Sequence, residues 1–141
     1  MTKGLVYLTR RVVFCSAHRL HSDKLSTRDN KKLFDKCNHK YGHGHNYVLH
    51  ITVKGHPDPN TGLIMNLVEL KEIIEKAVLD DFDHKHLNFD VEECFTQNPT
   101  VENLVLIIWD RLYPSLKNLL YEVKLEETEN NSAYYRGPHY G

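Results

Sequence analysis

The sequence predicts an α+β domain in which two helices lie on one face of an antiparallel sheet, in the order strand, strand, helix, helix, strand, strand. Residues 5–17 and 43–54 alternate apolar and polar side chains with a period of about two, which is typical of strands. Residues 67–82 and 101–113 space their apolar residues three and four apart, which is typical of helices. With 141 residues and no internal repeat or linker, the whole chain, 1–141, is expected to form a single domain.

The first two strands flank a long polar segment. The strand at 5–17 has apolar side chains on both parities, which predicts a sheet covered on both sides or a subunit interface. Residues 19–42 are polar and basic, and we expect a loop with one helical turn near 30–36. A loop of this length inside a domain is usually functional. The strand at 43–54 is followed by a turn rich in proline, glycine and asparagine at 55–62.

The second half of the chain carries clear helix signals. Asn66 is expected to cap the first helix, with a glutamate at the capping-box position, and this helix should end near residue 82. Residues 83–99 are expected to be irregular. Thr100 is expected to cap the second helix, which should end before Pro114 because proline interrupts helices.

The last two strands are expected at 121–127 and 132–136, joined by a turn at Asn130 and Asn131. The alternation of the first of these strands places Glu127 on the apolar face. An acid in that position either lies at the exposed end of the strand or faces a cationic or N–H-rich ligand. The residues alone leave both interpretations open.

Composition excludes several classes of protein. A hydrophobic content of 40% and a charged content of 26% are those of a soluble protein. No apolar run approaches the roughly 20 residues that cross a bilayer, so no membrane segment is expected. Three widely spaced cysteines argue against a disulfide framework and for reduced thiols in the cytoplasm.

The net charge of −1 conceals a strongly basic first part. Residues 1–40 contain ten Lys and Arg against three Asp and Glu, a balance of +7. This part of the chain could bind a polyanionic small molecule or a complementary face in an oligomer. Nucleic acid is not expected as a partner, because the basic residues are not interleaved with stacking aromatic residues.

Three histidines are the strongest functional signal. His43 and His45 flank a glycine in a strand, so their side chains point to the same face. His18 ends the earlier strand and could complete a set of three nitrogen ligands. Catalytic zinc uses three protein ligands and keeps one position open, whereas structural zinc needs a fourth ligand, which Cys37 could supply. The remaining histidines are interpreted as ordinary residues, except His84, which follows an aspartate.

The cysteines differ in their surroundings. Cys37 lies in the polar loop beside Lys36 and Lys40, and positive neighbours lower a thiol pKa and favour the thiolate. Cys37 is therefore expected to be reactive unless it is buried or binds the metal. Cys15 and Cys94 are expected to be buried and inert.

Two further positions have both a functional and an ordinary interpretation. Asp83 and His84 place a carboxylate beside an imidazole, which can fix its tautomer and raise its basicity. Such a dipeptide at the end of a helix is more often an ordinary terminal pair. Thr100 is adequately explained as a helix cap.

Taken together, the motifs resemble those of the 6-pyruvoyltetrahydropterin synthase family, in the family's order and over nearly the whole chain. They are Phe14-Cys-Ser-Ala-His18, Cys37-Asn38, Gly42-His-Gly-His-Asn-Tyr47, Asp58-Pro59, Thr61-Gly62, Met65-Asn-Leu67, Asp83-His-Lys85, Pro99-Thr100, Glu102-Asn103, Glu127-Thr128 and Asn130-Asn131. The resemblance implies the tunnelling fold, in which two-stranded hairpins from three subunits close a barrel. It also implies a homohexamer of two trimers with active sites between subunits.

The resemblance further implies a zinc-dependent lyase of tetrahydrobiopterin biosynthesis. Its substrate would be 7,8-dihydroneopterin triphosphate, and its products would be 6-pyruvoyltetrahydropterin and triphosphate. The ligands of Zn2+ would be His18, His43 and His45.

The remaining roles also follow from the resemblance. Cys37 would be the general base, and Asp83 and His84, from a neighbouring subunit, would complete a catalytic triad. Glu127 would anchor the pterin ring through its N–H groups, with help from Thr100. In the basic first part of the chain, Arg19, Lys24 or Arg28 could hold the triphosphate.

Alternatives remain open. His86 and Asn88 lean toward the bacterial 6-carboxytetrahydropterin synthase, which uses the same substrate and metal, so its product is the main alternative. A non-catalytic zinc-binding module with Cys37 as fourth ligand is a second. A cysteine hydrolase that uses Cys37 and His84 is a third, and it predicts a covalent intermediate and no need for zinc.

Overall fold

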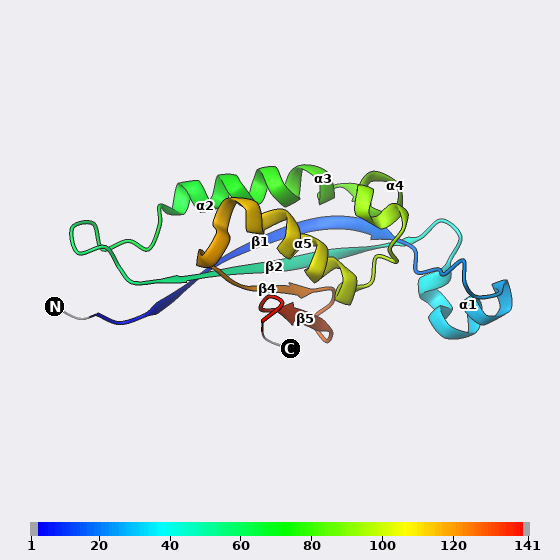
Figure 1. Ribbon diagram of the computed structural model, residues 1–141. Helices are drawn as coiled ribbons and strands as arrows, with labels where there is room; N and C mark the ends of the chain where they lie inside the picture. The colour runs from blue at the N-terminus through cyan, green and yellow to red at the C-terminus, as the bar shows by residue number, and fades with distance from the viewer. Residues whose placement is uncertain (1–2, 140–141) are drawn as a thin grey trace.

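The computed structural model describes residues 3–139, which form a twisted five-stranded sheet with helices over one face (Figure 1). In the order β3-β1-β2-β4-β5, the strands are Lys85–His86, Val6–His18, His43–Gly55, Leu120–Glu126 and Ser132–Tyr135. Every neighbouring pair is antiparallel except β1 and β3, which run parallel. The predicted α+β class and the four main strands are confirmed. The parallel strand β3 was missed because two residues are too few to show a periodicity.

The helices and turns are more numerous than expected. The helices are α1 (Thr27–Phe34), α2 (Leu67–Ile74), α3 (Asp80–Phe82), α4 (Leu87–Asp90) and α5 (Val101–Leu116), with 3-10 turns at Asp35–Asn38, Glu92–Phe95 and Lys117–Leu119. A π-helical turn, Glu75–Leu79, joins α2 to α3 as one continuous helix. None of the described helices is long and apolar enough to cross a membrane.

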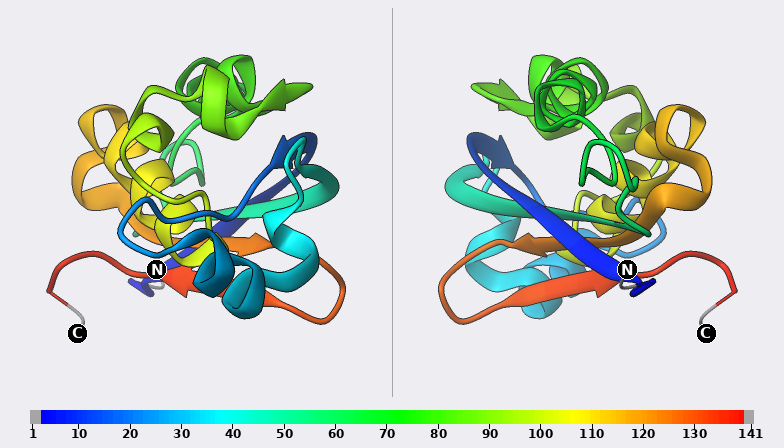
Figure 2. Two further views of the ribbon diagram at one scale, coloured as in Figure 1. Left: turned by 90° about the vertical axis from the view of Figure 1, so that its right-hand side faces the viewer. Right: turned by 90° about the vertical axis from the view of Figure 1, so that its left-hand side faces the viewer.

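One face of the sheet carries the core, and the other is open. Helices α2, α3 and α5 all lie on the same side of the sheet (Figure 2). Fully or almost fully buried residues between sheet and helices include Phe14, Tyr47, Leu49, Ile51, Leu70, Ile74, Leu104, Ile108 and Val123. On the opposite face Tyr7 and Val13 are 50% and 52% exposed. Within one subunit, the expectation of a sheet covered on both sides is therefore wrong, because no described helix reaches that face.

The helix signals predicted the starts of the helices better than their ends. The Asn66 side chain accepts a hydrogen bond from the Val68 amide, and the Thr100 hydroxyl accepts one from the Asn103 amide, so both caps are confirmed. The expected end before Pro114 is wrong, since α5 continues to Leu116. Proline removes only one backbone donor in the last turn, and the buried side chain of Leu116 holds that turn against the core.

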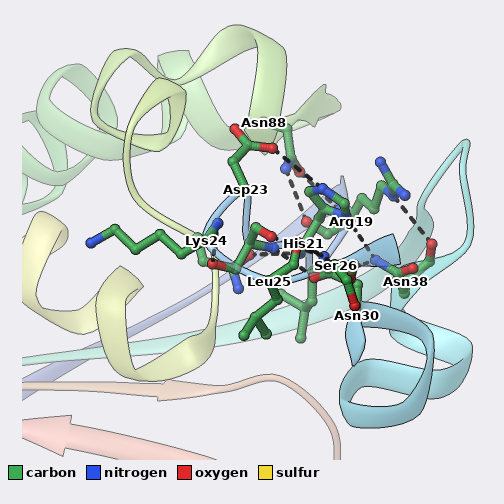
Figure 3. A network of polar contacts seen from close by, with 12 residues as sticks. Arg19, His21, Asp23, Lys24, Leu25, Ser26, Asn30, Asn38 and Asn88 are labelled. Carbon is green, nitrogen blue, oxygen red and sulfur yellow. Dashed lines mark hydrogen bonds and ion pairs between the residues drawn. The ribbon is translucent and has the colours of Figure 1, made fainter. Parts of the chain in front are cut away.

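The polar segment 19–42 is ordered by buried amide groups rather than by apolar packing (Figure 3). Asn30 is fully buried on α1, where its side chain accepts from the Ser22 amide at 2.8 Å and donates to the Ser22 carbonyl at 2.9 Å. The Asn38 side chain donates to the Leu20 carbonyl at 2.7 Å. The segment therefore contains a complete helix, longer than the predicted turn, packed at the end of the sheet where β1 finishes and β2 begins (Figure 1).

Candidate metal centre and adjoining pocket

Three histidines converge at the end of the β1–β2 hairpin. In the antiparallel register His18 lies opposite His43, and Ser16 lies opposite His45. The Nε2 atom of His43 is 3.1 Å from that of His18 and 2.9 Å from that of His45. One ligand atom from each side chain lies within 4.8 Å of the others. The expectation that these three residues form one cluster is confirmed.

Two of the three histidines are biased toward the neutral form that a metal requires. His18 is fully buried, and its Nδ1 lies 2.8 Å from the Pro99 carbonyl, to which a neutral ring with its proton on Nδ1 donates. Burial, together with the neighbouring imidazoles, lowers the His18 pKa from 6.5 to about 4. Burial and His45 also lower the pKa of His43. Neutral rings with Nε2 atoms turned toward a common point suit a soft or borderline divalent cation such as zinc.

Glu127 lies beside the cluster. It follows the last residue of β4, and its amide donates to the Asn131 carbonyl at 3.0 Å in the hairpin turn. Its carboxylate oxygens lie 4.0 Å from Nε2 of His18 and 3.9 Å from Nε2 of His45, and its side chain is 18% exposed. Glu127 therefore lies just after the end of the strand, with its carboxylate facing the histidine cluster, and its contact with a ligand stays a prediction.

Glu127 and Thr100 line the same pocket. This pocket has a volume of about 740 Å³ between α1, the start of α5 and the β4–β5 turn. Its other lining residues are Leu20, Leu33, Phe34, Val101, Glu102, Asn130, Asn131, Ser132 and Ala133. The Thr100 oxygen accepts the capping hydrogen bond, which leaves its O–H free to donate to a ligand. The lining combines apolar side chains with polar and acidic ones, so this concave site can hold a small polar molecule.

Cys37 lies near this pocket but does not have the predicted electrostatics. Its pKa is raised, first by burial and then by the charges of Glu127 and Asp35. The expected lowering by Lys36 and Lys40 is therefore wrong, because carboxylates and desolvation outweigh the lysines. Among the described residues, the cluster with metal-binding spacing contains the three histidines without Cys37, so the geometry does not favour a fourth thiolate ligand.

Asp83 and His84 form a preorganised pair on the edge of the sheet. The Asp83 carboxylate accepts from the Cys15 amide at 3.0 Å and lies 3.0 Å from Nδ1 of His84, and these two contacts lower the Asp83 pKa. The His84 amide donates to the Cys15 carbonyl at 2.6 Å. His84 has a φ of 60°, which is uncommon for a residue with a side chain, and that side chain is 82% exposed.

The catalytic residues expected from the sequence are not all brought together within one subunit. No hydrogen bond or ion pair between described residues joins Cys37 to Asp83 or His84. The expectation for Cys15 is also wrong, because its side chain is exposed on the open face of the sheet. The expectation for Cys94 is confirmed: it is 5% exposed, and burial raises the pKa of its thiol to about 12.

Two residues that support the cluster were not predicted. Tyr47 is fully buried, with its hydroxyl 3.3 Å from Nδ1 of His18. Its position two residues after His45 places it on the same face of the strand, and this signal could have identified it. Pro99 contributes only its carbonyl, and a backbone carbonyl has no signal in the sequence.

Gly42 offers a direct test of how the backbone holds the cluster. Its φ is +81°, and a Cβ atom there would lie 2.8 Å from the His18 carbonyl oxygen and 2.9 Å from Nε2 of His86. We expect Gly42→Ala to destabilise the protein by about 2–4 kcal/mol and to weaken metal binding, because His43 follows directly. Urea unfolding and zinc titration measure the two effects.

Gly62→Ala is the matched control. Gly62 also has a positive φ, +74°, but nothing lies within 4 Å of the added Cβ. This variant should lose only about 1–2 kcal/mol and keep its metal affinity. Equal losses of stability and unchanged zinc affinity in both variants would show that the close approach at Gly42 does not position the cluster.

Comparison with known proteins agrees with this site. Residues 7–138 match the family model described as 6-pyruvoyl tetrahydropterin synthase. The chain is 54% identical over 132 residues to the 6-pyruvoyl tetrahydrobiopterin synthase of Dictyostelium discoideum, covering 94% of this chain and 96% of that protein. The structure of Caenorhabditis elegans 6-pyruvoyl tetrahydropterin synthase superposes with a TM-score of 0.91 at 40% identity, covering 97% of this chain and 99% of that one.

A bacterial relative is more distant. The chain is 26% identical over 145 aligned positions to the 6-carboxy-5,6,7,8-tetrahydropterin synthase of Rickettsia felis, covering 89% of this chain and 96% of that protein. The identity to the Dictyostelium protein is about twice as high over a similar length. This chain is therefore clearly more similar to the Dictyostelium 6-pyruvoyl protein than to the Rickettsia 6-carboxy protein.

Proposed function

The chain belongs to the 6-pyruvoyl tetrahydropterin synthase family, and from this we propose that it converts 7,8-dihydroneopterin triphosphate to 6-pyruvoyltetrahydropterin and triphosphate in tetrahydrobiopterin biosynthesis. The observation that carries the proposal is the convergence of three histidine Nε2 atoms beside a carboxylate-walled pocket. Three nitrogen ligands with space left for a substrate are the arrangement of catalytic rather than structural zinc.

We propose zinc as the ion at His18, His43 and His45. The donor set fits, because all three side chains are imidazoles, the pKa values of His18 and His43 are lowered, and the Pro99 carbonyl fixes the tautomer of the buried His18 ring. Zinc, when bound, would supply a Lewis acid for the substrate's side-chain hydroxyls and a local positive charge. The rigid β1–β2 hairpin positions the three ligands before the metal binds.

Glu127 would hold the pterin ring. A pterin presents neighbouring N–H groups along one edge, and a carboxylate accepts two such hydrogen bonds side by side. With the ring edge at Glu127 and Thr100 in their shared pocket, the ring's side chain would extend toward His18 and His45, whose Nε2 atoms lie 3.9–4.0 Å from the carboxylate. This positioning brings the reacting carbons to the catalytic groups.

Glu127→Gln tests this role. The amide keeps the shape but loses the charge and one acceptor, so we expect the affinity for the pterin to fall about 10- to 100-fold. Zinc content should stay stoichiometric, because Glu127 is not among the three metal-binding residues. Binding of 7,8-dihydroneopterin, measured by calorimetry, gives the result, and Glu129→Gln in the adjacent exposed turn is the control. An unchanged affinity in Glu127→Gln would remove Glu127 from the pterin site.

We propose that Cys37 is the base that removes a carbon-bound proton from the substrate. Burial, Glu127 and Asp35 raise the pKa of its thiol, and added positive charge nearby would favour the thiolate. The exposed ring of His84, oriented by Asp83, could supply such charge and accept the proton if it comes from a second subunit. This role for His84 explains why its ring projects into solvent while its backbone is held firmly to β1.

Assembly into a homohexamer of two trimers is part of the proposal. The open face of the sheet exposes Tyr7 and Val13, and an isolated subunit would leave these apolar groups in water. Association through the sheets would cover them and bring the Asp83–His84 pair of one subunit to the pocket of another. Three free thiols suit a reducing, cytoplasmic setting.

Product identification tests the proposed reaction. Zinc-loaded protein incubated with 7,8-dihydroneopterin triphosphate should yield 6-pyruvoyltetrahydropterin and triphosphate, identified by mass spectrometry. A 6-carboxytetrahydropterin product would instead establish the alternative activity. No turnover with intact zinc would favour a non-catalytic module, and turnover that survives zinc removal would favour a cysteine hydrolase.

A further inference from the structure

Arg111 on α5 joins three other segments of the fold. Its Nε and Nη2 atoms donate side by side to the two carboxylate oxygens of Glu93, each at 2.7 Å. Its Nη1 atom donates to the Asp81 carboxylate at 2.7 Å and to the Ala77 carbonyl at 3.2 Å. The side chain is 18% exposed, and its hydrogen bonds lower the Glu93 pKa. A planar guanidinium with all three nitrogens engaged is held in one orientation.

The Ala77 carbonyl belongs to the π-helical turn Glu75–Leu79. In this turn the Asp80 amide donates to the Glu75 carbonyl, five residues back. Such turns are rare inside helices and occur often at functional sites. Arg111 therefore bonds the backbone of the continuous α2–α3 helix within its irregular turn.

The π turn keeps the buried stripe of this helix in line. A stripe spaced by four residues drifts around an α-helix by about 40° at each step, because four residues turn through about 400°. A turn closed by an i to i+5 hydrogen bond contains more residues, so the drift is smaller there. The fully buried residues at this spacing are Leu70, Ile74, Val78 and Phe82. The turn therefore brings the last of them into the core.

Phe82 fixes the start of the residue that follows it, Asp83. The Phe82 ring is fully buried, packs edge-on against Phe14 with 5.9 Å between the centroids, and has the Arg111 guanidinium carbon 5.2 Å from its centroid. The Phe82 carbonyl accepts a hydrogen bond from the Ser16 hydroxyl of β1. The residue directly before Asp83 is therefore held by the core, by the sheet and by Arg111.

The Asp83–His84 pair continues from this helix end. The Asp83 amide donates at 2.9 Å to the carbonyl of Leu79, the last residue of the π turn. Since the His84 side chain is 82% exposed, its direction depends on the backbone that carries it rather than on packing around the ring. A displaced helix end would therefore move the ring, and a misplacement of about 1 Å is enough to slow a reaction substantially.

We propose that Arg111 is a positioning residue for the reaction and acts through the Asp83–His84 pair. Its hydrogen bonds to the π turn and to α3, together with its contact with Phe82, hold the end of the α2–α3 helix. This sets the direction in which the His84 ring projects. The role rests on the proposed function, because the position of the pair affects turnover only if the pair takes part in it.

Arg111→Met in the full-length, zinc-loaded protein tests this role. Methionine keeps an apolar stem but none of the donors. We expect kcat for 7,8-dihydroneopterin triphosphate to fall about tenfold with KM within about twofold, because the pair is displaced while the pterin pocket is unchanged. Zinc should stay stoichiometric, since Arg111 is not part of the histidine cluster. Arg111→Lys, which keeps the charge but cannot bond Glu93 and Asp81 together, should recover part of the loss.

Leu116→Ala is the control for lost stability. Leu116 is 2% exposed in the last turn of α5, at the end of that helix that lies away from α3 in Figure 1. Its truncation should lower the melting temperature, because it leaves a cavity in the core. Its kcat should stay within about twofold of the unaltered protein, because a distant change in the core does not move the pair.

Hydrogen exchange reports on the pair without turnover. Followed by mass spectrometry, the amides of residues 80–86 should exchange about tenfold faster in Arg111→Met than in Leu116→Ala, because the helix end is released. If Arg111→Met does not fold, Arg111→Lys takes its place in both measurements. Faster exchange supports the proposal even if the unaltered protein is inactive on this substrate, a result that would count against the proposed function alone. Equal exchange at 80–86, or a kcat in Arg111→Met no lower than in Leu116→Ala, overturns it.

Discussion

His45→Ala is expected to abolish zinc binding at stoichiometric levels and to lower kcat/KM by about 1,000-fold or more. The Nε2 atom of His45 lies 2.9 Å from that of His43, so its removal takes away one of the three proposed ligands. Metal-ion catalysis contributes several kcal/mol of transition-state stabilisation, and each 1.36 kcal/mol is a factor of ten. Zinc content by atomic emission and steady-state kinetics measure the two losses.

His56→Ala is the control for this change. His56 is exposed in the turn after β2, where its ring hydrogen-bonds the Gly4 carbonyl, and it lies outside the cluster. This variant should keep zinc and activity within about twofold. Full zinc content and full turnover in His45→Ala would contradict the assignment of the metal centre.

Cys37→Ala is expected to retain zinc but to lower kcat by about 10²- to 10⁴-fold, the usual contribution of a general base. Its thiol lies outside the metal-binding cluster, so the ligand set stays intact. Cys37→Ser should not restore the lost activity, because a serine hydroxyl is a much weaker acid than a thiol. The burial and the carboxylates that raise the pKa of the thiol would also oppose ionisation of this hydroxyl. Single-turnover kinetics and zinc analysis on the same samples give both quantities.

Cys15→Ala makes the same chemical change at an exposed thiol on the open face of the sheet. The hydrogen bonds that join Cys15 to Asp83 and His84 use its backbone, so they are kept when its side chain is shortened. Full turnover in Cys37→Ala with zinc in place would rule out a base at this position. Loss of zinc in Cys37→Ala would instead indicate a closed, structural metal site.

The sequence predicted those features that depend on side-chain periodicity. Alternation places His43 and His45 on one face of β2, and the register of the hairpin brings His18 opposite. Likewise, Asn66 and Thr100 cap their helices as predicted, because a cap depends on local chemistry alone. Local rules were therefore sufficient for the main elements and for the convergence of the three histidines.

The features that were missed depend on contacts between distant segments. The order of residues 19–42 rests on Asn30 and Asn38, whose buried hydrogen bonds have no periodic signal. The pKa of Cys37 is raised first by burial and then by Glu127, ninety residues away in the chain. Local sequence patterns do not reveal such hydrogen bonds and pKa shifts, because these exist only once the fold has brought the groups together.

The local coordination of the bound zinc tests the central claim most directly. X-ray absorption at the zinc edge of the loaded protein should show only nitrogen and oxygen ligands at roughly 2.0–2.1 Å, three of them imidazole, as expected for an open site at His18, His43 and His45. Loss of one imidazole from the spectrum of His45→Ala would complete the assignment. A sulfur ligand at roughly 2.3 Å would place Cys37 on the metal, close the site and contradict its role as a base.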